Sequence, residues 1–100
     1  MLVVRQTFQA KYGRGDELVA LLRDFNKRMQ EEGGRMPRFR ILTDASGPFF
    51  NVVTEIETEN FADWETGFSE TMNRPWMGEW FGKMMGLVES GRRDFYHLVE

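Results

Sequence analysis

Apolar and polar positions alternate along the first ten residues. Leu2, Val4 and Phe8 share one parity, whereas Arg5 and Thr7 lie on the other. A period of two with β-branched residues is typical of a β-strand. The same alternation predicts further strands near residues 38–42, over 49–57 and over 92–99.

Between these segments the apolar residues recur at the spacing of an amphipathic helix. The first such pattern begins after Asp16, the expected N-cap, and ends at Gly33. The second opens at Asn60 and closes near Gly86. Pro75 interrupts it and is expected to start a further helical turn, so this helix is predicted to be broken in two.

The resulting order, βαββαβ, predicts an α+β fold of the ferredoxin-like type within a single domain, residues 1–100. This arrangement has a four-stranded sheet with the helices on one face. Both β–α–β crossovers are expected to be right-handed and to join parallel neighbouring strands.

The sheet face without helices is expected to be about half apolar. Its apolar members are expected to be Val3, Phe49 and Val53, with Phe95 or Tyr96 and Leu98 or Val99. A large apolar patch on a small protein usually marks an interaction surface, and the simplest partner is a second copy. The sequence therefore predicts a homodimer joined through the sheets; the alternative is a monomer with a partly apolar, solvated face.

Charge and composition exclude several partners. The formal net charge is −3, which argues against nucleic-acid binding and against docking on anionic membranes. The chain has no cysteine, which excludes disulfides, thiolate catalysis and cysteine-bound metal sites. The first eight residues do not read as a secretion signal, and a cytoplasmic location is predicted.

Polar candidates for chemistry gather on the helix-free face of the sheet. Arg5, Thr7, Asn51 and Glu55 should share that face and lie close together, because the first and third strands are expected to be neighbours. They could orient a polar substrate group, with Arg5 holding an oxyanion. In the alternative interpretation, Arg5 and Glu55 form a buried structural ion pair at the dimer interface.

Aromatic residues concentrate in the second helical region. Trp64, Trp80 and Phe81 could form the wall of a cavity for a flat apolar substrate between helix and sheet. Ordinary core packing explains the helical spacing of Phe61, Trp64 and Phe68 equally well. Four methionines between residues 72 and 85 would make such a wall adaptable.

His97 is the only histidine of the chain. It could act as a general base, or it could simply lie solvated near the end of the last strand. One imidazole without cysteine does not make a zinc site. No metal and no cofactor are predicted.

Three segments carry a resemblance to a known superfamily. The first strand, the residues that begin the first helix, and the last strand resemble those of the dimeric α/β-barrel proteins, in particular NIPSNAP-type domains and small proteins similar to antibiotic biosynthesis monooxygenases. The segments are residues 3–8 (VVRQTF), 13–18 (GRGDEL) and 93–99 (RDFYHLV). The resemblance implies a homodimer. The superfamily that it resembles includes cofactor-independent monooxygenases, haem-degrading enzymes, isomerases and many members of unassigned activity, so the resemblance does not imply one function.

Haem degradation is not predicted, because relatives with that activity place their iron-binding histidine in the second helical region, and residues 60–86 contain none. The remaining interpretation is an uncharacterised NIPSNAP-like protein, with a small organic molecule as a possible ligand between helices and sheet. The alternative is a cofactor-independent monooxygenase or isomerase acting on a small aromatic or polyketide-like substrate. A non-catalytic module with a filled interior also fits, so whether the chain is an enzyme stays open.

Overall fold

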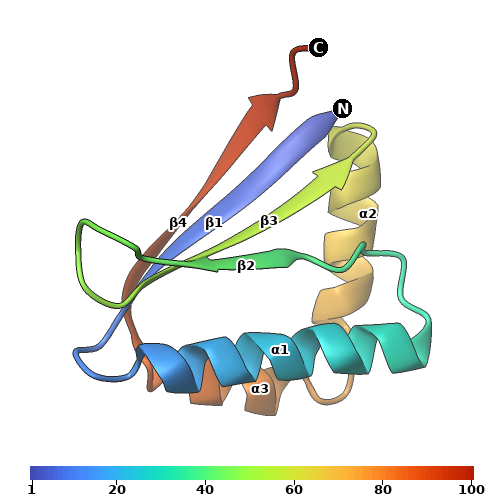
Figure 1. The fold of residues 1–100 in the computed structure, drawn as a ribbon. Helices are drawn as coiled ribbons and strands as arrows, with labels where there is room; N and C mark the ends of the chain where they lie inside the picture. The colour runs from blue at the N-terminus through green and yellow to red at the C-terminus, as the bar shows by residue number, and fades with distance from the viewer.

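The computed structural model describes all residues, 1–100, as four strands and three helices (Figure 1). The strands are β1 (Leu2–Ala10), β2 (Arg40–Thr43), β3 (Asn51–Thr58) and β4 (Val88–His97). The helices are α1 (Gly15–Glu32), α2 (Phe61–Met72) and α3 (Met77–Met85).

The strands form one sheet in the order β2-β3-β1-β4, which confirms the ferredoxin-like prediction. Every neighbouring pair is antiparallel. The expectation that the crossovers join parallel neighbours was therefore wrong. The two strands that each crossover connects are separated by an antiparallel strand, because β1 lies between β3 and β4 and β3 lies between β1 and β2.

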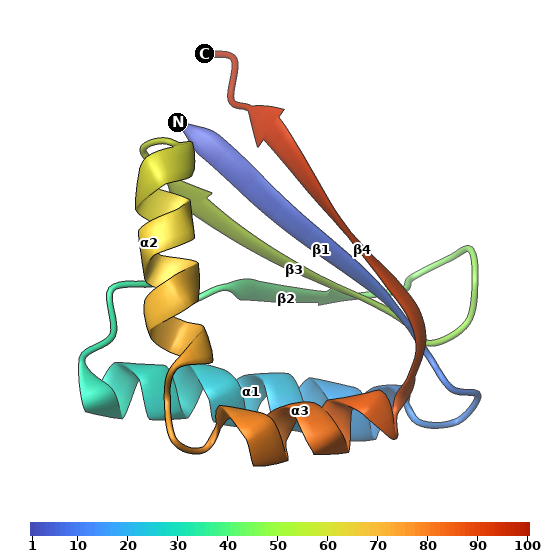
Figure 2. The same cartoon turned by 180° about the vertical axis from the view of Figure 1, so that it is seen from behind.

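All three helices cover the same face of the sheet, called here the inner face; the opposite one is the outer face (Figure 2). Helices α1 and α3 run side by side across one end of the sheet. Helix α2 stands apart from them, near the N-terminus and the end of β3 (Figures 1 and 2). None of the three is both long enough and apolar enough to cross a membrane.

The helix ends follow the predicted signals in part. Gly33 ends α1 with φ of 69°, and Asn60 caps α2 by accepting the backbone N–H of Asp63 at 2.8 Å. Asp16 is not the N-cap but lies in the first turn of α1, which begins one residue earlier. There its negative charge still faces the positive end of the helix dipole. Pro75 precedes α3 rather than starting it, since that helix begins at Met77.

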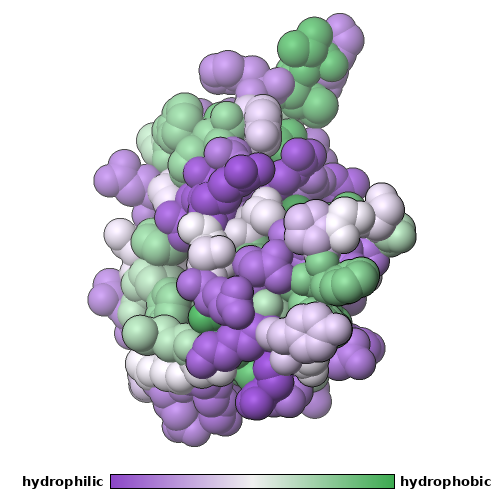
Figure 3. Space-filling model, turned by 90° about the vertical axis from the view of Figure 1, so that its left-hand side faces the viewer, coloured by the Kyte–Doolittle hydropathy of each residue, from purple (hydrophilic) through white to green (hydrophobic).

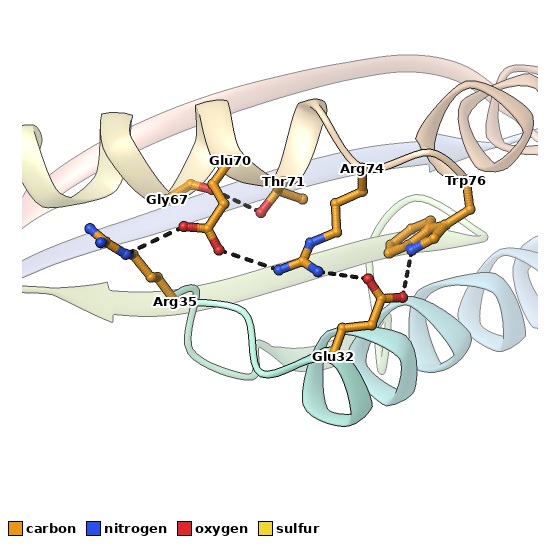
Figure 4. Close-up of polar contacts among 7 residues, drawn as sticks. All are labelled: Glu32, Arg35, Gly67, Glu70, Thr71, Arg74 and Trp76. Carbon is orange, nitrogen blue, oxygen red and sulfur yellow. Dashed lines mark hydrogen bonds and ion pairs between the residues drawn. The ribbon is translucent and has the colours of Figure 1, made fainter.

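An ion-pair network holds the junction between α2 and α3 against the end of α1 (Figure 4). Arg74 donates from Nη1 to Glu32 at 2.6 Å and from Nη2 to Glu70 at 3.3 Å. Glu32 also accepts the indole N–H of Trp76 at 2.7 Å, and Arg35 pairs with Glu70. The side chain of Arg74 is only 15% exposed, so two carboxylates compensate an enclosed positive charge.

The apolar core consists of two parts. The larger part packs α1 and α3 against one end of the sheet and includes Leu18, Leu22 and Val52. The smaller part lies towards the other end of the sheet, where Leu2, Val4 and Ile56 are buried.

The outer face is less apolar than expected. By strand register its apolar members are Val3, Leu42, Val53 and Tyr96. The remaining positions on that face are polar or charged: Arg5, Thr7, Gln9, Arg40, Asn51, Glu55, Glu57, Ser90, Arg92 and Asp94. Phe49 lies outside the strands, and Phe95 pairs with Val4 on the inner face. Figure 3 shows this side as a mosaic of hydrophilic and hydrophobic groups.

Candidate functional site

A row of polar side chains crosses the otherwise apolar inner face of the sheet. Gln6 in the central strand β1 lies opposite Thr54 of β3 and opposite Arg93 of β4. Its parity is that of the buried Val4, so all three side chains point towards the helices. We call Thr54, Gln6 and Arg93 the polar row.

The members of the polar row are joined by hydrogen bonds. Arg93 donates from Nε and Nη2 to the Oε1 atom of Gln6, at 3.1 and 2.8 Å. Gln6 in turn donates from Nε2 to the hydroxyl of Thr54 at 3.4 Å, and Thr54 is only 2% exposed. The guanidinium of Arg93 also lies over the rings of Trp64 and Phe68, at 5.0 and 4.7 Å from their centroids.

A cavity of about 190 Å³ lies between the polar row and the helices. It is lined by 17 residues, 14 of them hydrophobic. The polar row supplies the other three, and Arg93 is the only ionisable residue among the 17. The hydrophobic wall comes from the sheet, the helices and the segment before β2: Val4, Phe8, Leu22, Phe25, Met36, Phe39, Ile56, Trp64, Phe68, Met72, Met77, Trp80, Phe81 and Met84.

The three aromatic candidates from the sequence all line this inner cavity. Trp80 is buried and donates its indole N–H to the backbone carbonyl of Leu21 at 3.1 Å, which fixes its ring. Trp64 stacks on Phe68 with ring centroids 4.9 Å apart. Phe81 is 38% exposed and lies where the cavity meets solvent.

The polar candidates from the sequence lie on the other side of the sheet. Arg5 donates from Nε to Glu55 at 2.6 Å, and Arg40 donates to the second oxygen of Glu55 at 2.5 Å. Thr7 and Asn51 lie at the far end of the outer face, in an open depression with no hydrophobic lining residue. The structure therefore separates the expected polar anchors from the aromatic wall by the thickness of the sheet.

The outer-face ion pairs have a clear electrostatic signature. The hydrogen bond from Arg5 is the main reason that the pKa of Glu55 is lowered from its ordinary value of 4.5, and it raises the pKa of Arg5. The Glu55 side chain is 10% exposed, while those of Arg5 and Arg40 are 43% and 71% exposed. Glu55 is thus shielded by its two partners at the protein surface, where solvent screens part of their attraction.

His97 belongs to neither group. It is the last residue of β4 and is paired with Leu2 at the exposed end of the sheet. The structure gathers no group of three His, Asp or Glu side chains that could hold a metal ion.

Sequence reasoning missed Gln6, Thr54 and Arg93 as members of one site. The signal was present for Gln6, since a polar residue stands at the same parity as Leu2, Val4 and Phe8. The position of Arg93 required the register between β1 and β4, which the sequence does not state.

Solved structures with the same chain path are numerous, although no protein-family model and no curated protein matches the chain. An uncharacterised NIPSNAP domain protein from Burkholderia xenovorans superimposes with a TM-score of 0.85 over 99% of this chain and 95% of its own, at 17% identity. A NIPSNAP family protein from Agrobacterium tumefaciens gives 0.85 over 99% and 93%, at 13% identity. The chain has the NIPSNAP fold.

Proteins similar to antibiotic biosynthesis monooxygenases also share this fold, but they superimpose on the chain with lower TM-scores. A proposed antibiotic biosynthesis monooxygenase from Deinococcus radiodurans superimposes with a TM-score of 0.72 over 100% of this chain and 94% of its own, at 17% identity. The resemblance read from the sequence is confirmed at the level of the fold. At such identities the likeness establishes chain topology, while function must be argued from the site.

The ion pairs of Glu55 predict a specific pH dependence of stability. In the folded state the pKa of Glu55 is lowered, so the ionised carboxylate stabilises the protein above the ordinary pKa of 4.5. This stabilisation is lost as the pH falls through the lower, folded-state pKa. We expect Glu55→Gln to lower the unfolding free energy at pH 7 by about 1 kcal/mol and to lose less stability than wild type on acidification.

Urea unfolding at pH 7 and pH 3 measures both effects. Glu57→Gln is the matched control, because Glu57 lies two residues along the same strand, is exposed and forms no ion pair. If the unfolding free energy of wild type and of Glu55→Gln falls equally between pH 7 and pH 3, the ion pairs of Glu55 do not cause the pH dependence.

Proposed function

We propose that the protein works as a homodimer and binds a small organic molecule in the inner cavity of each subunit. The main support for ligand binding is the cavity itself, an apolar space of about 190 Å³ with convergent polar groups on one wall. An engineered apolar cavity of about 150 Å³ already accommodates benzene. A ligand the size of one aromatic ring or a short alkyl chain fits this volume.

The lining of the cavity supports a binding role more directly than a catalytic one. Proton abstraction needs a base within hydrogen-bond reach of the substrate. Among the lining residues Arg93 alone is ionisable, and it remains protonated at physiological pH. The site therefore offers hydrogen-bond donors and an apolar wall but no protein base, which disfavours an isomerase.

A neutral aromatic probe tests the binding role. We expect toluene to shift the indole N–H signals of Trp64 and Trp80, which line the cavity, and to leave that of Trp76 unchanged. Trp76 is an internal control because its indole is bonded to Glu32 outside the cavity. The measurement is a ¹H–¹⁵N NMR titration, and Met72→Trp, which places a bulkier side chain in the wall, should abolish the shifts. Absence of any shift at Trp64 and Trp80 would refute the proposal.

The outer face supports the homodimer. No helix covers this side, and the apolar side chains of Leu42 and Tyr96 are 44% and 46% exposed on it. Asp94 on the same face pairs through its Oδ2 atom with Arg92 at 3.1 Å, so this charge needs no partner from a second subunit. The C-terminal end projects from the subunit (Figures 1 and 2), and Val99 is 89% exposed.

A charge in the middle of the outer face should break the homodimer. We expect sedimentation to give a mass of about twice 11.8 kDa for wild type, and 11.8 kDa for Val53→Glu. Val53 lies between Thr7 and Leu42 on that face, beside the carboxylate of Glu55, so a buried like charge is costly. Ala20→Glu on the exposed side of α1 is the control and should remain dimeric. A wild-type mass of 11.8 kDa would refute the proposed homodimer.

A cofactor-independent monooxygenase is the second candidate, favoured by the fold shared with the Deinococcus radiodurans protein and by the guanidinium of Arg93 and the amide of Gln6 in the cavity. In such a reaction a CH₂ group becomes a carbonyl: one oxygen atom of O₂ enters the substrate, the other leaves as water, and the substrate supplies both electrons and both hydrogens. Because the cavity has no base, the substrate must already be ionised at neutral pH.

Oxygen consumption with an acidic phenol or cyclic 1,3-diketone tests this candidate. We expect O₂ uptake with wild type and a loss of about 100-fold with Arg93→Gln, because the guanidinium would stabilise the developing oxyanion. Uptake equal to that of buffer alone would leave the protein as a binding module. A cytoplasmic location remains a prediction from the cysteine-free composition.

A further inference from the structure

Arg93, the one charged residue that lines the inner cavity, has no counterion. The nine ion pairs of the structure leave Arg93 out. Its only side-chain hydrogen-bond acceptor is Gln6, which is neutral. Arg93 is partly exposed, and its partial burial lowers its pKa. A positive charge thus lines an apolar cavity without a carboxylate partner.

Other arginines of the chain have carboxylate partners. Arg74, at the junction of α2 and α3, has carboxylates of Glu32 and Glu70 on either side (Figure 4). On the outer face Arg5 and Arg40 share Glu55. Arg93 differs from all three, because it forms no ion pair although it lines the apolar inner cavity.

The arginine is nonetheless held in a fixed place. Gln6 accepts from two of its nitrogens, and the rings of Trp64 and Phe68 lie within 5.0 Å of its guanidinium carbon. Its Nη1 donates to no protein acceptor. An oriented guanidinium with free N–H groups matches a carboxylate in geometry as well as in charge.

We infer that the inner cavity binds a small organic carboxylate, whose apolar body lies among the aromatic and methionine side chains and whose carboxylate pairs with Arg93. This inference rests on the proposed function and specifies its ligand class. The cavity volume of about 190 Å³ limits the body to about one ring or a short alkyl chain. The anion supplies the missing counterion.

Matched pairs of probes test the inference at pH 7. Benzoate and hexanoate carry the charge, whereas benzamide and hexanamide have nearly the same shape without it. We expect each carboxylate to bind 10- to 100-fold more tightly than its amide, in keeping with a charge-assisted hydrogen bond. Calorimetry gives the affinities, and the indole signals of Trp64 and Trp80, with Trp76 as the internal control, locate the bound probe.

Variants of two adjacent arginines assign the preference to one residue. Arg93→Gln should remove the preference for carboxylate while leaving amide binding unchanged, and Arg93→Lys should retain part of it. Arg92→Gln is the matched control, since Arg92 is the neighbouring residue but lies on the outer face beside Asp94. It should keep the wild-type preference, and the preference should weaken as the salt concentration rises.

The outcomes separate the two proposals. Equal affinity of acid and amide for wild type would overturn the anion site and leave the apolar cavity as the binding site. A preference that survives Arg93→Gln would also overturn it. If none of the four probes and no neutral aromatic binds, the proposed function itself fails, and the anion site fails with it. The wild-type comparison decides the matter even if Arg93→Gln does not fold.

Discussion

The register of the central strand is the constraint on which the rest of the structure depends. Strand β1 pairs with β3 on one side and with β4 on the other, and its residues alternate between the two faces of the sheet. The pairing places Arg5 and Glu55 together on the outer face and Gln6, Thr54 and Arg93 together on the inner one. A slip of one residue would exchange the faces of every side chain in the shifted strand, exposing Val4 and burying Arg5.

The two polar groups that this register creates differ in kind. On the outer face, Glu55 accepts hydrogen bonds of 2.5 and 2.6 Å from Arg40 and Arg5, so each arginine has a carboxylate partner within the subunit. On the inner face, the row of Thr54, Gln6 and Arg93 carries a net positive charge into an apolar setting. The first arrangement is suited to holding strands together, and the second to receiving a ligand.

Much of the fold could be predicted from the sequence because its signals are local. Alternation gave the strands, helical spacing gave both helical regions, and Asn60 and Gly33 marked helix ends by their own chemistry. Asp16 was wrongly predicted as the N-cap, because an aspartate is common both at the N-cap and in the first turn of a helix, and the sequence does not distinguish the two positions. The apolar content of the outer face was overestimated because the parity of β4 was left open, and Phe95 proved to face the helices.

The candidate site was only half predictable for the same physical reason. The aromatic wall could be found because Trp64, Trp80 and Phe81 belong to one helical region, whereas the polar wall joins residues 6, 54 and 93 through hydrogen bonds between strands. Pairing registers are set by the whole sheet and by its packing, so no single segment records them. Residues Arg5, Thr7, Asn51 and Glu55 were grouped correctly with one another but lie across the sheet from the cavity.

Four of the side chains that enclose the inner cavity are methionines: Met36, Met72, Met77 and Met84. Unbranched thioether side chains change rotamer at little cost and fit many outlines of similar size. A wall of this composition discriminates poorly between molecular shapes. Under the proposed binding function, selectivity then comes from the rigid, hydrogen-bonded end of the cavity, and substitutions at Thr54, Gln6 and Arg93 would change the class of small molecule that this chain accepts.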